Sequence, residues 1–129
     1  MSHFSINRIR IKNPNIDLLR STISQLAKEM NGELVSEIED FYGRKRTGFI
    51  VAVKTPSIPW GVGVRVADDG SVEVVADRFR YGAAIKTFEQ RLVQLYTAKA
   101  LGIALANLGY QVETQEQKDL IMLRAVSYA

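Results

Sequence analysis

The sequence contains no cysteine and a single histidine, His3. The lack of cysteine excludes disulfide bonds, a thiol nucleophile and Cys-ligated zinc or iron–sulfur sites. With one histidine, the chain cannot supply a poly-histidine metal site by itself. No stretch approaches the roughly 18 consecutive apolar residues that cross a bilayer, and residues 1–5 carry no apolar signal region. We therefore expect a protein of the cytoplasm or another reducing compartment, without cofactor, metal or membrane contact.

The composition is that of an ordinary folded chain. Of the 129 residues, 47% are hydrophobic and 24% are charged, which is too apolar for a disordered chain. This length suits one core, and no linker or repeat interrupts it, so we predict a single domain over residues 1–129. The net charge of +3 is below the surplus that would make nucleic-acid binding the default.

Two segments have helical spacing of apolar residues. Leu19, Ile23, Leu26 and Met30 predict a helix that begins at residues 13–14, where Asn13 is the expected cap, and that stops at a left-handed Gly32. A second helix is predicted over residues 83–108. Between and around them, alternating apolar residues predict strands over 3–12, 34–39, 48–54, 62–67, 72–77, 110–114 and 120–128. A change of parity within the first strand predicts a bulge near residues 7–8 or a change of register.

The order of these elements predicts the fold class. The Asp-Gly pair at residues 69–70 is typical of a tight hairpin, so strands 62–67 and 72–77 should pair antiparallel. The order β-α-β-β-β-β-α-β-β clusters the strands between helices, which predicts an α+β fold with a largely antiparallel sheet. Both helices are amphipathic, so we expect them to pack on one face of the sheet and to leave the other face to solvent or to a partner.

Several short stretches together resemble a known family. They are residues 1–5 (MSHFS), residues 75–77 (VAD) and residues 109–113 (GYQVE) followed by Gln115-Glu116. Over nearly the whole chain the sequence is similar to the hypothetical chloroplast frame thirty-five family of cyanobacteria and algal plastids, which has bacterial and archaeal relatives. The resemblance implies no catalytic residues, because none are accepted for the family. It implies an accessory role, since relatives are encoded near AAA-type ATPases.

One departure from the plastid pattern concerns a candidate contact segment. Arg78, Phe79, Arg80 and Tyr81 follow Asp77 where the family more usually has a tryptophan-containing sequence. If this segment is extended, Phe79 and Tyr81 face one way and the two arginines the other. The aromatics could then stack bases while the arginines pair with acidic groups. The alternative is that the aromatics pack in the core and that Asp77 forms an ion pair with an arginine.

A second candidate contact segment is a compact basic run. Arg44, Lys45 and Arg46 lie between glycines at an expected hairpin tip. Such cations can contact phosphates. The alternative is that they are solvated surface charges that increase solubility and bind nothing.

The candidates for catalysis are weak. His3 lies beside Ser2 and Ser5, but a nucleophilic pair also needs an orienting carboxylate. Glu37 and Glu39 share one face of an extended segment, where a solvated surface is the simpler interpretation than acid–base chemistry or a divalent-ion site. We therefore expect no enzymatic activity.

The apolar run at residues 120–123 (LIML) bears on assembly. Apolar residues of both parities predict burial on both faces, either by the domain itself or by another subunit. The sequence thus predicts a non-catalytic accessory or adaptor domain that acts through protein contacts, with a protein partner or a homo-oligomer. The alternative is a nucleic-acid-binding module that uses the basic and aromatic segments.

Overall fold

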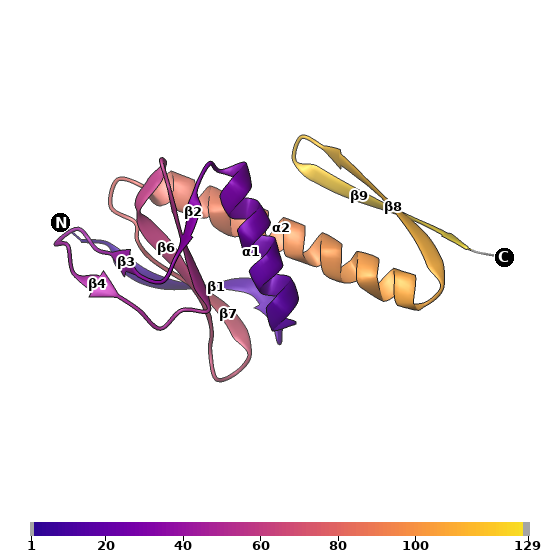
Figure 1. Ribbon diagram of the computed structural model, residues 1–129, viewed down its shortest axis with the longest axis horizontal. Helices are drawn as coiled ribbons and strands as arrows, with labels where there is room; N and C mark the ends of the chain where they lie inside the picture. The colour runs from indigo at the N-terminus through magenta and orange to yellow at the C-terminus, as the bar shows by residue number, and fades with distance from the viewer. Residues whose placement is uncertain (1, 128–129) are drawn as a thin grey trace. The chain divides into compact units, whose positions relative to one another are not determined.

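The computed structural model describes residues 2–127, which form an α+β fold of two helices and antiparallel sheets (Figure 1). These residues divide into two compact units, one up to Val93 and one from Gln94 onward. Neither described helix is long and apolar enough to span a membrane. In chain order the elements are β1 (Phe4–Lys12), α1 (Ile16–Glu29), β2 (Glu33–Val35), β3 (Ile38–Glu39), β4 (Lys45–Arg46), β5 (Val51–Thr55), β6 (Ile58–Val66), β7 (Ser71–Asp77), α2 (Gly82–Asn107), β8 (Tyr110–Gln117) and β9 (Leu120–Ser127).

The first unit is built on a five-stranded antiparallel sheet with the order β1-β7-β6-β5-β2. The predicted hairpin joins β6 to β7. In its turn the Ala67 amide donates to the Ser71 carbonyl at 2.8 Å, and the Asp69 carboxylate accepts from the Ser71 amide at 2.9 Å. The antiparallel pairing of these strands is therefore confirmed.

One face of this sheet is lined with valines and covered by both helices. Val51, Val64 and Val74 lie opposite one another across β5, β6 and β7 and so share this face. Val53, Val62, Val64, Val72 and Val74 are completely buried. Helix α2 lies on this face, because Asn7, which pairs with Val74, donates to its Glu89 at 2.6 Å. Arg91 of α2 forms a 3.0 Å ion pair with Glu29 of α1, so the helices are neighbours, as predicted.

The opposite face carries a small apolar cluster. Ile38 of β3 is fully buried and packs with Ala52 and Val75, and Phe4, Val35 and Phe49 border this cluster. The single strand predicted over 34–39 is thus wrong: β2 joins the main sheet, whereas β3 pairs with β4 in a separate two-stranded sheet. The face expected to lie open to solvent or a partner is therefore partly covered by this chain.

The boundaries of α1 differ from the prediction at its start. The cap is Asn15, whose side chain accepts a 3.0 Å hydrogen bond from the Leu18 amide. Asn13 instead has a φ of +50° and donates its amide to the Gly70 carbonyl, so it belongs to the turn beside the β6–β7 hairpin. A capping side chain can serve only the helix whose first amides it reaches.

The end of α1 also differs. The left-handed residue is Asn31, with a φ of +55°, whereas Gly32 has no positive φ. Gly32 lies so close to β5 that a Cβ there would be 2.6 Å from the Lys54 carbonyl oxygen. The irregularity predicted near residues 7–8 of β1 lies slightly later, as a shift in the register with β7 between Arg8 and Lys12.

The second unit contains the rest of α2 and the hairpin of β8 and β9, whose register runs from Tyr110 opposite Ser127 to Gln117 opposite Leu120. In the apolar run, Leu120 and Met122 are 62% and 50% exposed, whereas Ile121 and Leu123 on the opposite face are half-buried. The described residues thus cover only one face of this segment. Its burial by another subunit stays a prediction.

Candidate functional site

The basic run lies on the loop after β3 and on β4, exposed as predicted but paired with carboxylates. Arg44 Nε is 3.0 Å and an Arg46 guanidinium nitrogen 3.7 Å from Asp40 Oδ2. Lys45 Nζ is 3.1 Å from Glu37 Oε1, and this ion pair raises the pKa of the lysine. The three cations therefore carry their own counter-charges, supplied by the segment that precedes them.

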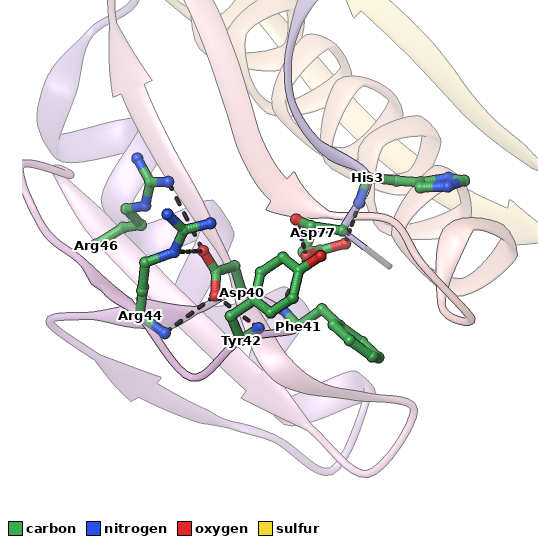
Figure 2. Close-up of polar contacts among 8 residues, drawn as sticks. His3, Asp40, Phe41, Tyr42, Arg44, Arg46 and Asp77 are labelled. Carbon is green, nitrogen blue, oxygen red and sulfur yellow. Dashed lines mark hydrogen bonds and ion pairs between the residues drawn. The ribbon is translucent and has the colours of Figure 1, made fainter.

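The buried carboxylate of Asp40 organises this loop (Figure 2). Its Oδ1 accepts hydrogen bonds from the amides of Tyr42 and Arg44, at 2.9 and 3.0 Å. Burial by itself raises the pKa of Asp40, but the two amides and the Arg44 guanidinium outweigh it, so the pKa lies below its usual 3.8. The carboxylate is thus ionised at neutral pH and fixes the loop from inside.

A second buried carboxylate, Asp77, joins three segments. Its Oδ2 accepts from the Ser2 hydroxyl at 2.6 Å and from the Phe41 amide at 2.8 Å. Its Oδ1 accepts from the amides of His3 at 2.8 Å and Phe79 at 3.0 Å. The residues before β1, the loop after β3 and the segment after β7 are therefore tied to one side chain. Figure 2 shows His3 and Phe41 on either side of Asp77.

Asp77 makes stability depend on pH. Burial raises its pKa, but the Ser2 hydroxyl and the three amides lower it more, from 3.8 to about 2. As the pH falls, the unfolded chain takes up this proton first, so the stabilisation is complete above about pH 5 and is lost towards pH 2. With about 1.4 kcal/mol per pKa unit, the loss is roughly 2 kcal/mol.

Urea unfolding at a series of pH values measures this loss. Asp40 and Asp69 also have lowered pKa values and steepen the same trend. The contribution of Asp77 is therefore the difference in slope between the wild-type protein and Asp77→Asn. Equal slopes for the two proteins would contradict the assignment.

Around Asp77 and Asp40 lies a continuous group of aromatic side chains, which we call the aromatic surface. Its ring centroids are 5.1 Å apart for Phe41–Phe79, 5.1 Å for Phe41–Tyr42, 6.0 Å for Phe41–Trp60 and 5.0 Å for Trp60–Tyr81, and every pair is edge-to-face. Tyr42 is 62% exposed, and the other four are partly exposed. The surface therefore consists of Phe41, Tyr42, Trp60, Phe79 and Tyr81.

Two arginines stack on this surface. The guanidinium of Arg44 lies 5.3 Å from the centre of the Tyr42 ring, and that of Arg80 lies 5.3 Å from the centre of Phe79. Arg80 has a φ of +69°, so the chain turns here. The extended alternation predicted for residues 78–81 is therefore wrong, because this backbone turn brings Arg80 onto its neighbour's ring.

Arg78 has a different place. Its guanidinium donates two hydrogen bonds to Glu89 of α2, at 3.0 and 3.2 Å, and its Nε donates to the Ser5 hydroxyl at 2.7 Å. Within residues 2–127, the ion pair predicted between Asp77 and an arginine is not formed, since the carboxylate accepts from backbone amides and the Ser2 hydroxyl instead. Arg78 thus holds α2 against β1.

His3 lies at the border of the aromatic surface. Its ring centre is 5.6 Å from that of Phe79, and in Figure 2 the imidazole points away from Asp77, which the His3 amide contacts. The neighbouring hydroxyls are engaged elsewhere: Ser2 donates to Asp77, and Ser5 accepts from Arg78.

The paired glutamates are also engaged. Glu37 binds Lys45, and Glu39 is 3.2 Å from Lys54 Nζ. Among residues 2–127, no group of three or more histidine, aspartate or glutamate side chains is arranged to hold a metal ion.

Three of the five residues of this surface were not identified from the sequence. Phe41, Tyr42 and Trp60 join Phe79 and Tyr81 only through the fold, because they come from the β3–β4 loop and from β6. An aspartate directly before an aromatic pair and a glycine, as in residues 40–43, is a turn signal that could have drawn attention to the loop.

The chain was compared with three sets of known proteins. Family models, curated proteins and solved structures all gave no match to the chain.

Proposed function

We propose that this protein is a non-catalytic adaptor that binds a protein partner through the aromatic surface. The observation that carries the proposal is a group of five partly exposed aromatic rings that contact one another edge-to-face, with two arginines stacked on them. Tryptophan, tyrosine and arginine dominate the energetic centres of protein interfaces. Edge-to-face ring pairs add stabilisation beyond the area that they bury.

The surface is also held in place before any partner arrives. Asp77 fixes the backbone at Phe41 and Phe79, and Asp40 fixes it at Tyr42. Rings whose backbone is already ordered lose less conformational entropy on binding, which favours affinity.

The pairing of the basic run favours a protein over a nucleic acid. A phosphate that approached Arg44 or Arg46 would also approach the buried, ionised Asp40, which those cations neutralise. Electrostatic affinity for a nucleic acid comes from protein cations that neutralise phosphates and so displace the counter-ions condensed on the nucleic acid. Cations held by the protein's own carboxylate contribute little to it.

The family resemblance extends this proposal. We infer that the chain belongs to the hypothetical chloroplast frame thirty-five family and acts in the cytoplasm, with an AAA-type ATPase as the partner class that the resemblance implies. Neither inference is needed for the aromatic surface to bind a protein.

Affinity capture with single-residue variants tests the proposal. Carboxy-terminally tagged wild-type protein is compared with Tyr42→Ala in native lysate, with and without nuclease, and captured proteins are quantified by mass spectrometry. Removal of an exposed hot-spot tyrosine costs about 2 kcal/mol of binding free energy. We therefore expect a partner that survives nuclease and is depleted more than tenfold by Tyr42→Ala.

Tyr110→Ala is the matched control, because Tyr110 is an exposed tyrosine in the second unit. It should capture the same partner as the wild-type protein. Material that disappears with nuclease would replace the proposal with the nucleic-acid alternative. A partner that is retained equally by Tyr42→Ala would show that the aromatic surface is not the contact.

A further inference from the structure

The main sheet ends in an exposed edge at β1. Among the described strands, only β7 pairs with β1. The Arg78 amide donates to the His3 carbonyl, and Phe4 lies opposite Asp77. Because antiparallel pairs alternate between bonded and non-bonded, residues 3, 5 and 7 turn their backbone groups towards β7. The amides and carbonyls of Phe4, Ile6 and Arg8 therefore point outwards from the sheet.

A groove runs beside this edge. It has a volume of about 350 Å³ and is lined by residues 7–10 of β1 and by four residues of α2, including Lys86 and Val93. Its floor is mixed, because Ile9 and Val93 are apolar whereas Arg10 and Lys86 are charged. A strand edge next to a helix is the geometry in which domains add an extended peptide to their own sheet.

The charges around the groove are predominantly positive. Arg10 and Lys86 are exposed, and among the described residues neither has an ion-pair partner. Arg8 is shared between Asp69 at 3.0 Å and Glu73 at 3.6 Å. The one carboxylate in the lining, Glu89, is neutralised by Arg78, with Asn7 also bound to it. The net field therefore attracts an acidic ligand.

We propose that the groove between β1 and α2 binds an extended acidic segment of a partner protein, which adds to the sheet beside β1. The outward amides and carbonyls of Ile6 and Arg8 supply the main-chain hydrogen bonds, and Arg10 and Lys86 select carboxylates. This site shares no residue with the aromatic surface, so one molecule can hold two partner segments and bridge them.

Fluorescence anisotropy with a short, labelled peptide of alternating glutamate and valine tests the site. The full-length protein should bind this peptide, more weakly as salt rises. A lysine–valine peptide of the same length should not bind. A glutamate–valine peptide with alternate backbone nitrogens methylated should lose at least about tenfold in affinity, because it keeps the charges but cannot complete the strand ladder.

Two variants separate charge from backbone. Lys86→Glu should weaken binding about tenfold, whereas Arg20→Glu, the same charge reversal at an exposed position of α1, should have little effect. Ile6→Pro removes an outward amide without touching the ladder to β7, a place where edge strands tolerate proline. It should weaken binding, whereas Ile6→Ala should not. Circular dichroism of each variant confirms that it is folded.

A direct readout is amide hydrogen exchange followed by NMR. The amides of Ile6 and Arg8 should become protected when the glutamate–valine peptide is added. Failure of that peptide to bind at low salt, equal binding of the lysine peptide, or unchanged exchange at both amides would each overturn the proposal. Displacement of the peptide by a single-stranded oligonucleotide, with Lys86→Glu abolishing oligonucleotide binding, would assign the groove to nucleic acid instead. Tyr42→Ala should leave peptide binding intact, so failure here is distinguishable from failure of the proposed adaptor surface.

Discussion

Asp77→Ala should lower the free energy of unfolding by about 3 kcal/mol at neutral pH. The side chain is 1% exposed and accepts four hydrogen bonds, three of them from backbone amides. Alanine leaves those amides without an acceptor in a site that water reaches poorly, and each unsatisfied buried donor costs about 1–3 kcal/mol. Some relaxation of the chain start and of the loop after β3 reduces the total.

Urea unfolding monitored by far-UV circular dichroism measures this change. Asp68→Ala is the matched control. Asp68 is an exposed aspartate in the β6–β7 turn and makes no side-chain hydrogen bond or ion pair with residues 2–127, so its loss should change stability by less than about 0.5 kcal/mol. Intrinsic tryptophan fluorescence should also shift in Asp77→Ala, because Trp60 packs against Phe41. A stability within error of the wild-type value would refute the role given to Asp77.

Gly61→Ala should cost about 3 kcal/mol as well, for a different reason. Gly61 has a φ of +90° within β6, and a Cβ there would be 2.8 Å from Cγ2 of the buried Ile38. The left-handed backbone costs a side chain about 1–2 kcal/mol, and overpacking adds about 1–3 kcal/mol. The pairing of β5 with β6 is already irregular beside this residue, between Val53 and Thr55. The strand pair therefore has little room for a further shift that would accommodate the added methyl group.

Gly43→Ala separates the two costs. Gly43 also has a positive φ, +77°, but apart from its two chain neighbours no heavy atom of the described residues lies within 4 Å of the position a Cβ would take. The free energy of unfolding of Gly43→Ala should therefore fall only by the cost of a left-handed backbone, about 1–2 kcal/mol. Thermal and urea unfolding give the loss in free energy of unfolding for each variant. The difference between the two losses measures how tightly Ile38 packs against β6. Equal losses would mean that β3 moves away without resistance.

The parts of the fold that depend on neighbouring residues were predictable. The spacing of Leu19, Ile23 and Leu26 reports one buried helix face, and the three are at most 1% exposed. The Asp-Gly pair at residues 69–70 specifies a hairpin by its own backbone preferences. Such signals need no knowledge of what packs against them, so the α+β class and the antiparallel pairing followed from the sequence.

The parts that depend on distant residues were not predictable. The residues between β2 and β3, Ser36 and Glu37, carry no local signal that the two strands join different sheets. The separation depends on the packing of Ile38 against Ala52 and Val75, on the face of the main sheet opposite the helices. The choice of Asn15 over Asn13 as the cap likewise depends on a bond from Asn13 to Gly70, far along the chain.

The candidate site shows the same division. The sequence identified Phe79, Arg80 and Tyr81, which are adjacent, and placed Arg44 on an exposed tip. It did not reveal that Asp40 neutralises that tip, although Asp40 and Arg44 are only four residues apart. It also did not reveal that Trp60 completes the aromatic surface, because Trp60 and Tyr81 meet only after the sheet has formed.

The two hydrogen bonds that Asp77 accepts from Ser2 and His3 have a practical consequence for handling the protein. They hold Ser2 and His3 beside Phe79, so a protein fused ahead of Ser2 would be tethered close to the aromatic surface. An affinity tag, fluorophore or carrier protein at that position would obstruct the partner binding that we propose for this surface. A negative binding result obtained with such a fusion would therefore not test the proposal, which is why the capture experiment uses a carboxy-terminal tag.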